Sequence, residues 1–178
     1  MKKKKIAIIG TPSSGKTTLA NKLSKIFNIS VYHLDKIFWK DNGIHLSQTE
    51  FIEQVEKITK EPYWIIEGSM PRSKTLDIRI ENADIIIFYD IPLLIILWRQ
   101  TKRFFKYYNQ TRPDMGGNNK QKWPFTWKEV KYAFNYPTKE IYSKIQPYTN
   151  NKEIIIIKNI KDEINFLQTV NSLIEKNL

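Results

Sequence analysis

The stretch GTPSSGKTT, Gly10 to Thr18, decides the fold that we expect for this chain. It matches the phosphate-binding pattern G-x-x-x-x-G-K-[ST], with Gly10, Gly15, Lys16 and Thr17 at the fixed positions. Glycines let the backbone fold closely around phosphate oxygens, and the start of a following helix adds unpaired N–H groups and the positive end of the helix dipole. The stretch therefore predicts a nucleotide phosphate site; the alternative is an ordinary Gly/Ser turn that contains a lysine.

The flanking residues favour the phosphate site. Ile6 to Ile9 form a short apolar run that is typical of a buried parallel strand, and apolar residues recur at helical spacing from Thr18 to Phe27. In such a loop Lys16 reaches the β- and γ-phosphates, and Thr17 places its hydroxyl on Mg²⁺. The residues predicted to bind ATP are Gly10, Thr11, Pro12, Ser13, Ser14, Gly15, Lys16, Thr17 and Thr18.

Composition limits the class of protein. The 178 residues, 41% of them hydrophobic, fit a single domain, residues 1–178, with a sizeable core. The absence of cysteine excludes disulfides and thiolate metal sites and suits a cytoplasmic location. The start MKKKKIAIIG has too few apolar residues for a signal peptide, and the apolar stretch Ile85 to Trp98 is broken by Asp90 and Pro92. We therefore expect no membrane partner.

Strand and helix patterns alternate along the chain, which predicts an α/β fold with three layers: a five-stranded parallel sheet with helices on both faces. The predicted strands are Ile6 to Ile9, Ser30 to His33, Tyr63 to Glu67, Asp84 to Tyr89 and Glu153 to Ile157. The predicted helices begin at Thr18, at the capping box Ser47 to Glu50, at about Pro92, at Trp127 with a bend at Pro137, and at Glu163. The polar segment Asn109 to Lys122 is predicted to be a mobile loop.

Ligands of such sheets bind at the carboxyl ends of the strands, so the residues there are site candidates. Asp35 could bind a water on Mg²⁺ or accept a proton from a substrate hydroxyl; the alternative is a turn or helix-cap aspartate. Glu67, with Gly68 and Arg72 in the loop after it, is predicted to bind the acceptor; for Glu67 the alternative is an ion pair with a nearby lysine. His33, within a strand, is predicted to be a core residue.

Two further strand ends carry candidate residues. Asp90 could assist the metal, but Pro92 close behind it makes a helix N-cap an equal alternative. Lys158 and Asn159 follow the last predicted strand. Both are therefore candidates for contact with the nucleotide.

The net charge of +11 is concentrated in one part of the chain. All five arginines lie between Arg72 and Arg112, and arginine is the residue that binds phosphate through two parallel hydrogen bonds. Arg99 and Arg103 share one helix face and, with Arg112, could close over the triphosphate and stabilise the transferring phosphoryl group; the alternative is a solvated basic face. The segment Trp98 to Tyr148 holds 13 of the 23 aromatic residues, which could serve either a core or nucleic-acid binding.

These motifs together resemble the small adenylate-kinase-like P-loop proteins labelled DNA topology modulation protein. The resemblance rests on GTPSSGKTT, VYHLDKIFW, WIIEG, TLDIRIENAD, FYDIP, LWRQTKR and TRPDM. It implies a nucleotide-kinase-like fold, a small lid at about residues 99–122, and the loop Lys158 to Lys161 near adenine. Where that family usually has Asp-Gly-Asn-Tyr, this chain has Glu67 to Met70.

Three functions remain open at this point. The first is a phosphotransferase that uses ATP and Mg²⁺ on a small-molecule or nucleotide acceptor, as a monomer or homodimer. The second is an ATP-binding regulator that acts on DNA topology through the basic, aromatic-rich segment. A regulatory GTPase is the third, and the chain has no N-K-x-D base-recognition motif after any predicted strand to support it.

Overall fold

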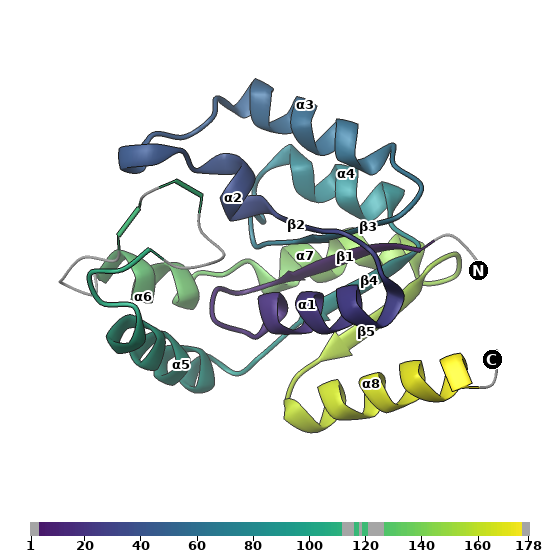
Figure 1. The fold of residues 1–178 in the computed structure, drawn as a ribbon. Coiled ribbons are helices and arrows are strands. Elements are labelled where there is room, and N and C mark those ends of the chain that lie inside the picture. Colours follow the sequence, from purple (N-terminus) through teal and green to yellow (C-terminus); the bar gives the residue numbers. More distant parts are fainter. Residues whose placement is uncertain (1–3, 112–115, 118, 121–126, 176–178) are drawn as a thin grey trace.

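A five-stranded parallel sheet forms the centre of the molecule (Figure 1). The computed structural model describes residues 4–111, 116, 117, 119, 120 and 127–175. The strands are β1 (Lys5–Gly10), β2 (Val31–His33), β3 (Trp64–Glu67), β4 (Ile85–Tyr89) and β5 (Glu153–Ile157), in the order β2-β3-β1-β4-β5. This confirms the predicted fold class, and it places the phosphate-binding loop at the middle of the carboxyl edge.

Successive residues of the strands face opposite sides of the sheet, so the molecule has two cores. Ile6 and Ile8 pack with α1 (Lys16–Phe27), α5 (Leu93–Lys106) and α8 (Ile160–Glu175). Ala7 and Ile9 pack with α3 (Gln48–Thr59), α4 (Lys74–Asn82) and α7 (Thr138–Ile145) on the other face. The result is the three-layer arrangement seen in Figure 1.

Local sequence accounts for the helix boundaries. The capping box at α3 is confirmed, since the Ser47 side chain accepts a hydrogen bond from the Glu50 N–H and the Glu50 carboxylate accepts one from the Ser47 N–H. The prediction of one helix from Trp127 to Ile145 with a bend at Pro137 is wrong, because α6 (Trp127–Phe134) and α7 are separate helices. Pro137 is the cause, because proline has no N–H to continue the helical ladder.

Four further elements lie outside the expected pattern. They are α4, which follows the loop after β3, the short helix α2 (Leu34–Phe38) and the 3₁₀ turns η1 (Asp41–Gly43) and η2 (Gln146–Tyr148). Because α2 begins directly after β2, Asp35 lies in the first turn of a helix rather than in an open loop.

The described residues of the segment expected to be a mobile loop are packed. A Cβ atom on Gly116 would lie 2.6 Å from the Lys36 carbonyl oxygen, so the two backbones meet at a distance that only glycine permits. The Asn119 side chain accepts a hydrogen bond from the Gly43 N–H at 2.6 Å and donates to the Lys40 carbonyl at 2.6 Å. These residues therefore dock on the stretch from α2 to η1.

Candidate functional site

The loop between β1 and α1 has the backbone that a phosphate site requires. Gly10 and Gly15 adopt φ angles of 147° and 116°, and Ser13 lies in the left-handed region at 64°. A Cβ atom on Gly10 would lie 2.7 Å from both the Cβ and the carbonyl oxygen of Tyr89. Only glycine fits this position, because any side chain would collide with β4.

The N-terminus of α1 has the features of an anion-binding site. In the described part of the chain no side chain caps its N-terminus, and its first turn contains no acidic residue. The unpaired N–H groups and the helix dipole are therefore available to phosphate oxygens. Lys16 is only 6% exposed, and its Nζ donates to the Thr11 carbonyl at 2.6 Å, which keeps the ammonium group against the loop.

A cleft of about 1080 Å³ opens beside this loop. It contains residues of the loop, of α1, of α2, of the β3–α4 loop, of α5, of α6 and of α8. Those lining it are Pro12, Ser13, Gly15, Lys16, Thr17, Thr18, Asn21, Lys22, His33, Asp35, Lys36, Glu67, Gly68, Ser69, Met70, Arg99, Gln100, Arg103, Tyr107, Tyr132, Ile160 and Glu163. The cleft has the size of a small-molecule site and brings most of the predicted site residues together.

The α5 arginines lie on the cleft side of their helix. The Arg99 Nη1 donates to the Ser14 carbonyl at 2.6 Å, which ties α5 to the phosphate-binding loop. Arg103, one turn further on, also lines the cleft. Arg112 lies outside the described residues, so its predicted role stays a prediction.

Glu67 lies beside Thr17, and its expected contact with the acceptor stays a prediction. The Thr17 hydroxyl donates to Glu67 Oε1 at 3.1 Å, and His33 Nδ1 lies 2.7 Å from the same oxygen. Glu67 is 5% exposed. His33 is a cleft residue rather than the core residue that we predicted, because its ring faces this carboxylate at the strand end.

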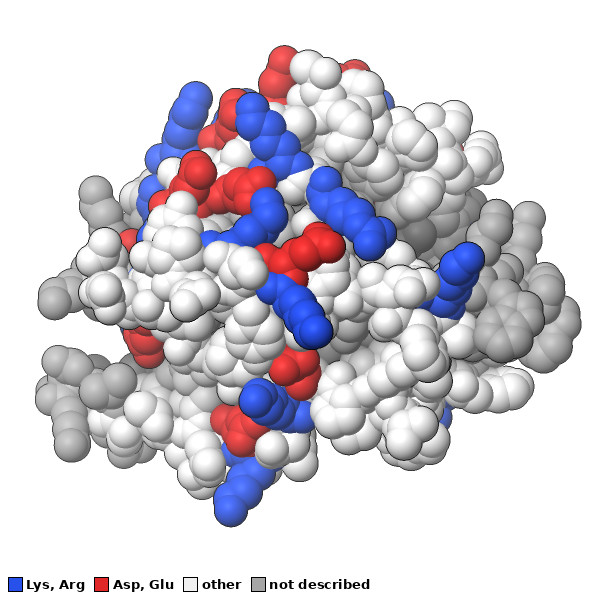
Figure 2. Space-filling model, turned by 180° about the vertical axis from the view of Figure 1, so that it is seen from behind, with Lys and Arg blue, Asp and Glu red and all other residues white. Residues whose placement is uncertain are grey.

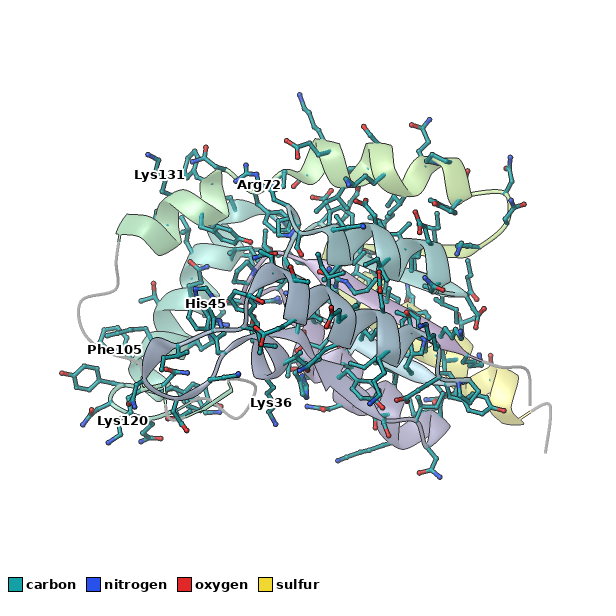
Figure 3. All side chains as sticks on the ribbon, turned by 90° about the horizontal axis from the view of Figure 1, so that it is seen from above. Lys36, His45, Arg72, Phe105, Lys120 and Lys131 are labelled. Atoms are coloured by element: carbon teal, nitrogen blue, oxygen red, sulfur yellow. The ribbon has the colours of Figure 1, made fainter. Side chains whose placement is uncertain are left out.

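Asp35 and Gly68 both border the cleft, but Arg72 is not among its lining residues. Gly68 packs so closely on α2 that a Cβ atom would lie 2.7 Å from the Leu34 Cβ. Arg72 is exposed and lies on the α6 side of the molecule, near Tyr132 (Figure 3). The predicted acceptor contact of Arg72 stays a prediction.

The remaining strand-end candidates serve the fold. The Asp90 carboxylate accepts a hydrogen bond from the Tyr142 hydroxyl at 2.9 Å and is not among the residues lining the cleft, and its metal role stays a prediction. The Asn159 side chain caps α8 by accepting from the Lys161 and Asp162 N–H groups. Ile160, the next residue, lines the cleft and is 60% exposed, while Lys158 is not part of the lining.

Several site residues were missed from the sequence. The fully buried guanidinium of Arg79 donates to the carbonyls of Gly68 and Ser69, at 3.1 and 3.3 Å, and so shapes the loop after β3. Gln100 is 3% exposed, lines the cleft, and its Oε1 has no hydrogen-bond partner in the described structure. Tyr132 hydrogen-bonds Ser69 through their hydroxyls at 3.1 Å. Nothing in their spacing distinguishes these residues from core or surface residues.

The surface charge gives little support to nucleic-acid binding on the face shown in Figure 2. Lysines and arginines there are interspersed with acidic residues instead of forming a continuous basic track.

None of the helices in the described ranges is long and apolar enough to cross a membrane.

No protein-family model and no curated protein matches the chain. Solved structures do. A shikimate kinase from Aquifex aeolicus matches at 19% identity and a TM-score of 0.54, covering 97% of this chain and 96% of that one. A gluconokinase from Sinorhizobium meliloti 1021 matches at 10% identity and a TM-score of 0.54, covering 99% of both chains. Deoxyadenosine kinase from M. mycoides matches at 13% identity and a TM-score of 0.50, covering 92% of this chain and 97% of that one.

The chain has the P-loop kinase fold. The neighbours are named for three chemically different acceptors, so the shared fold does not select one of them. None of the three carries the DNA topology label, and that resemblance stays a prediction from the sequence.

Proposed function

We propose that this protein is a phosphotransferase that transfers the γ-phosphate of ATP, with Mg²⁺, to a hydroxyl of a small-molecule or nucleotide acceptor. The observation that carries the proposal is a single cleft shared by the phosphate-binding residues Lys16 and Thr17, the carboxylates Asp35 and Glu67, and an arginine of α5. This is the combination of groups that phosphoryl transfer requires, since catalysis there consists of positioning and charge stabilisation.

Residues of the loop and of α5 bind the phosphates. The backbone N–H groups at the start of α1 donate hydrogen bonds to the anionic phosphate oxygens, and Lys16 leaves the Thr11 carbonyl to contact the β- and γ-phosphates. Arg99, which bonds the Ser14 carbonyl of the loop, and Arg103, one turn further along α5, add positive charge to the cleft. Charge that develops on the transferring phosphoryl group is stabilised there in a partly water-excluded site.

Thr17 and Glu67 fit a Mg²⁺ site. The described residues contain no cluster of three or more His, Cys, Asp or Glu that would bind a metal alone. This suits Mg²⁺, which keeps several waters and takes one or two protein ligands together with substrate phosphates. When bound, Mg²⁺ neutralises charge on the β- and γ-phosphates. Thr17 donates its O–H to Glu67, so the lone pairs of its oxygen remain available to the metal, and Asp35 contributes through water.

The acceptor binds on the side of the cleft formed by α2, the β3–α4 loop and α6. Asp35 accepts the proton of the acceptor hydroxyl as it attacks the γ-phosphate. Ser69 and Tyr132 present hydroxyls there, and the carboxamide of Gln100 lines the same cleft. These groups suit an acceptor with several hydroxyl or amide groups.

The test is a panel of nucleosides, nucleotides, sugars and hydroxy acids, assayed for phosphate transfer from Mg²⁺-ATP. Lys16→Ala is the blank, and Lys25→Ala, an exposed lysine of the same helix, is the matched control. One acceptor should stimulate turnover in the wild type and in Lys25→Ala, and not in Lys16→Ala. ATP binding without turnover on any acceptor would contradict the kinase proposal and favour an ATP-dependent switch.

A further inference from the structure

The last residues of β2 and β3 are neighbours in the sheet. His33 and Glu67 are register partners in parallel strands, so their side chains leave the carboxyl edge next to each other. Glu67 is in turn the register partner of Ile8 in β1, the strand that leads into the phosphate-binding loop. Thr17, at the start of α1, then lies within hydrogen-bond distance of Glu67.

The side chains of His33 and Thr17 both contact the same oxygen of the Glu67 carboxylate. His33 Nδ1 lies 2.7 Å from Oε1, and the Thr17 hydroxyl donates to Oε1 at 3.1 Å. Because an ionised carboxylate can only accept hydrogen bonds, His33 must carry its proton on Nδ1. Oε2 makes no hydrogen bond with any residue in the described part of the chain, so it is the oxygen that remains available to a metal-bound water.

We infer that His33 is a positioning residue that fixes Glu67 for Mg²⁺ binding; the inference rests on the proposed use of Mg²⁺-ATP. The two side chains are only 13% and 7% exposed, so water does not compete effectively for Oε1. Without the histidine, a single hydroxyl would orient the carboxylate, and Glu67 would gain rotational freedom. Partners of this kind, one step removed from the metal, affect metal affinity by 10–100-fold as a rule.

The chain supplies its own control. His45 is the only other histidine. It stacks on Phe38 with a centroid distance of 4.8 Å and hydrogen-bonds the Leu46 carbonyl, and it does not line the cleft. Substitution of His45 therefore removes an imidazole of the same fold without touching Glu67.

The experiment measures the affinity for ATP by calorimetry, in EDTA and again in Mg²⁺. His33→Leu should lower the Mg²⁺-dependent gain in affinity by about tenfold or more while affinity in EDTA stays within about twofold. His33→Asn, whose amide N–H can replace Nδ1–H, should restore most of the gain. His45→Leu should behave as wild type, and a melting curve of each variant checks that it is folded.

Three results separate the outcomes. If His33→Leu keeps the full Mg²⁺ gain, or loses affinity equally in EDTA and Mg²⁺, the positioning role is wrong. If the wild type binds ATP equally well with and without Mg²⁺, the inference fails while ATP binding stands. If the wild type binds no ATP at all, both the proposed function and this inference fail.

Discussion

Substitution of Arg79 tests how the acceptor side of the cleft keeps its shape. The side chain is fully buried in α4, and its three donor groups bond the carbonyls of Thr75, Gly68 and Ser69 at 3.0, 3.1 and 3.3 Å. No carboxylate in the described ranges forms an ion pair with it. Burial lowers the pKa of Arg79 from 12.5 to about 10, so the group is still charged at neutral pH.

The expected cost follows from two opposing effects. In Arg79→Met the carbonyls of Gly68 and Ser69 lose their donors, at about 1–3 kcal/mol each. Removal of the buried charge offsets at most about 3 kcal/mol of this loss, as estimated from the fall in pKa. With the two carbonyls at the middle of that range, about 4 kcal/mol together, we expect a net loss of at least about 1 kcal/mol in the free energy of unfolding. Arg79→Lys should cost more, about 3–5 kcal/mol, because lysine keeps the charge but lacks the planar fork.

Urea unfolding of the two variants measures this loss, with Arg72→Met as the matched control. Arg72 is exposed, so its substitution should change the free energy of unfolding by no more than about 0.5 kcal/mol. In folded Arg79→Met, affinity for ATP should be kept while acceptor binding weakens, since Gly68 and Ser69 line the cleft. A wild-type stability for Arg79→Met, or a lysine variant more stable than the methionine variant, would refute the reasoning.

Three other results are expected. Burial raises the pKa of Tyr89 and Tyr136, so the folded protein keeps both hydroxyls protonated. Their contribution to the free energy of unfolding is complete below about pH 10, and above it the contribution of each falls by about 1.4 kcal/mol per pH unit. Urea titrations at pH 7 to 11 can check this. Gly116→Ala should undock its segment from Lys36, seen as faster hydrogen exchange there, whereas Gly43→Ala meets no atom within 4 Å and should cost only about 1 kcal/mol of left-handed strain. Gln100→Met should raise the free energy of unfolding by about 1 kcal/mol, because it removes a buried oxygen that has no hydrogen-bond partner in the described structure. It should also weaken acceptor binding. An unchanged free energy of unfolding would contradict the destabilising effect assigned to that oxygen.

The sequence alone determined the layers of this protein and its phosphate-binding loop. The spacing of Gly10, Gly15 and Lys16 predicted the loop, and the strands and most helix starts followed from apolar periodicity and the capping box at Ser47. These features depend on contacts within a few residues of the chain, and local sequence therefore encodes them directly. The bend expected at Pro137 became a break for an equally local reason.

Tertiary structure alone decided which side chains meet at the cleft. Glu67 contacts Thr17 and His33 because three strands are in register, and those residues lie up to 50 positions apart. The sequence marked Glu67 as a strand end but could not say which neighbour its carboxylate would face. Arg79 looks like any helix residue until its guanidinium is found beneath Gly68. Strand order and register set these distances, and the spacing of residues along the sequence does not predict them.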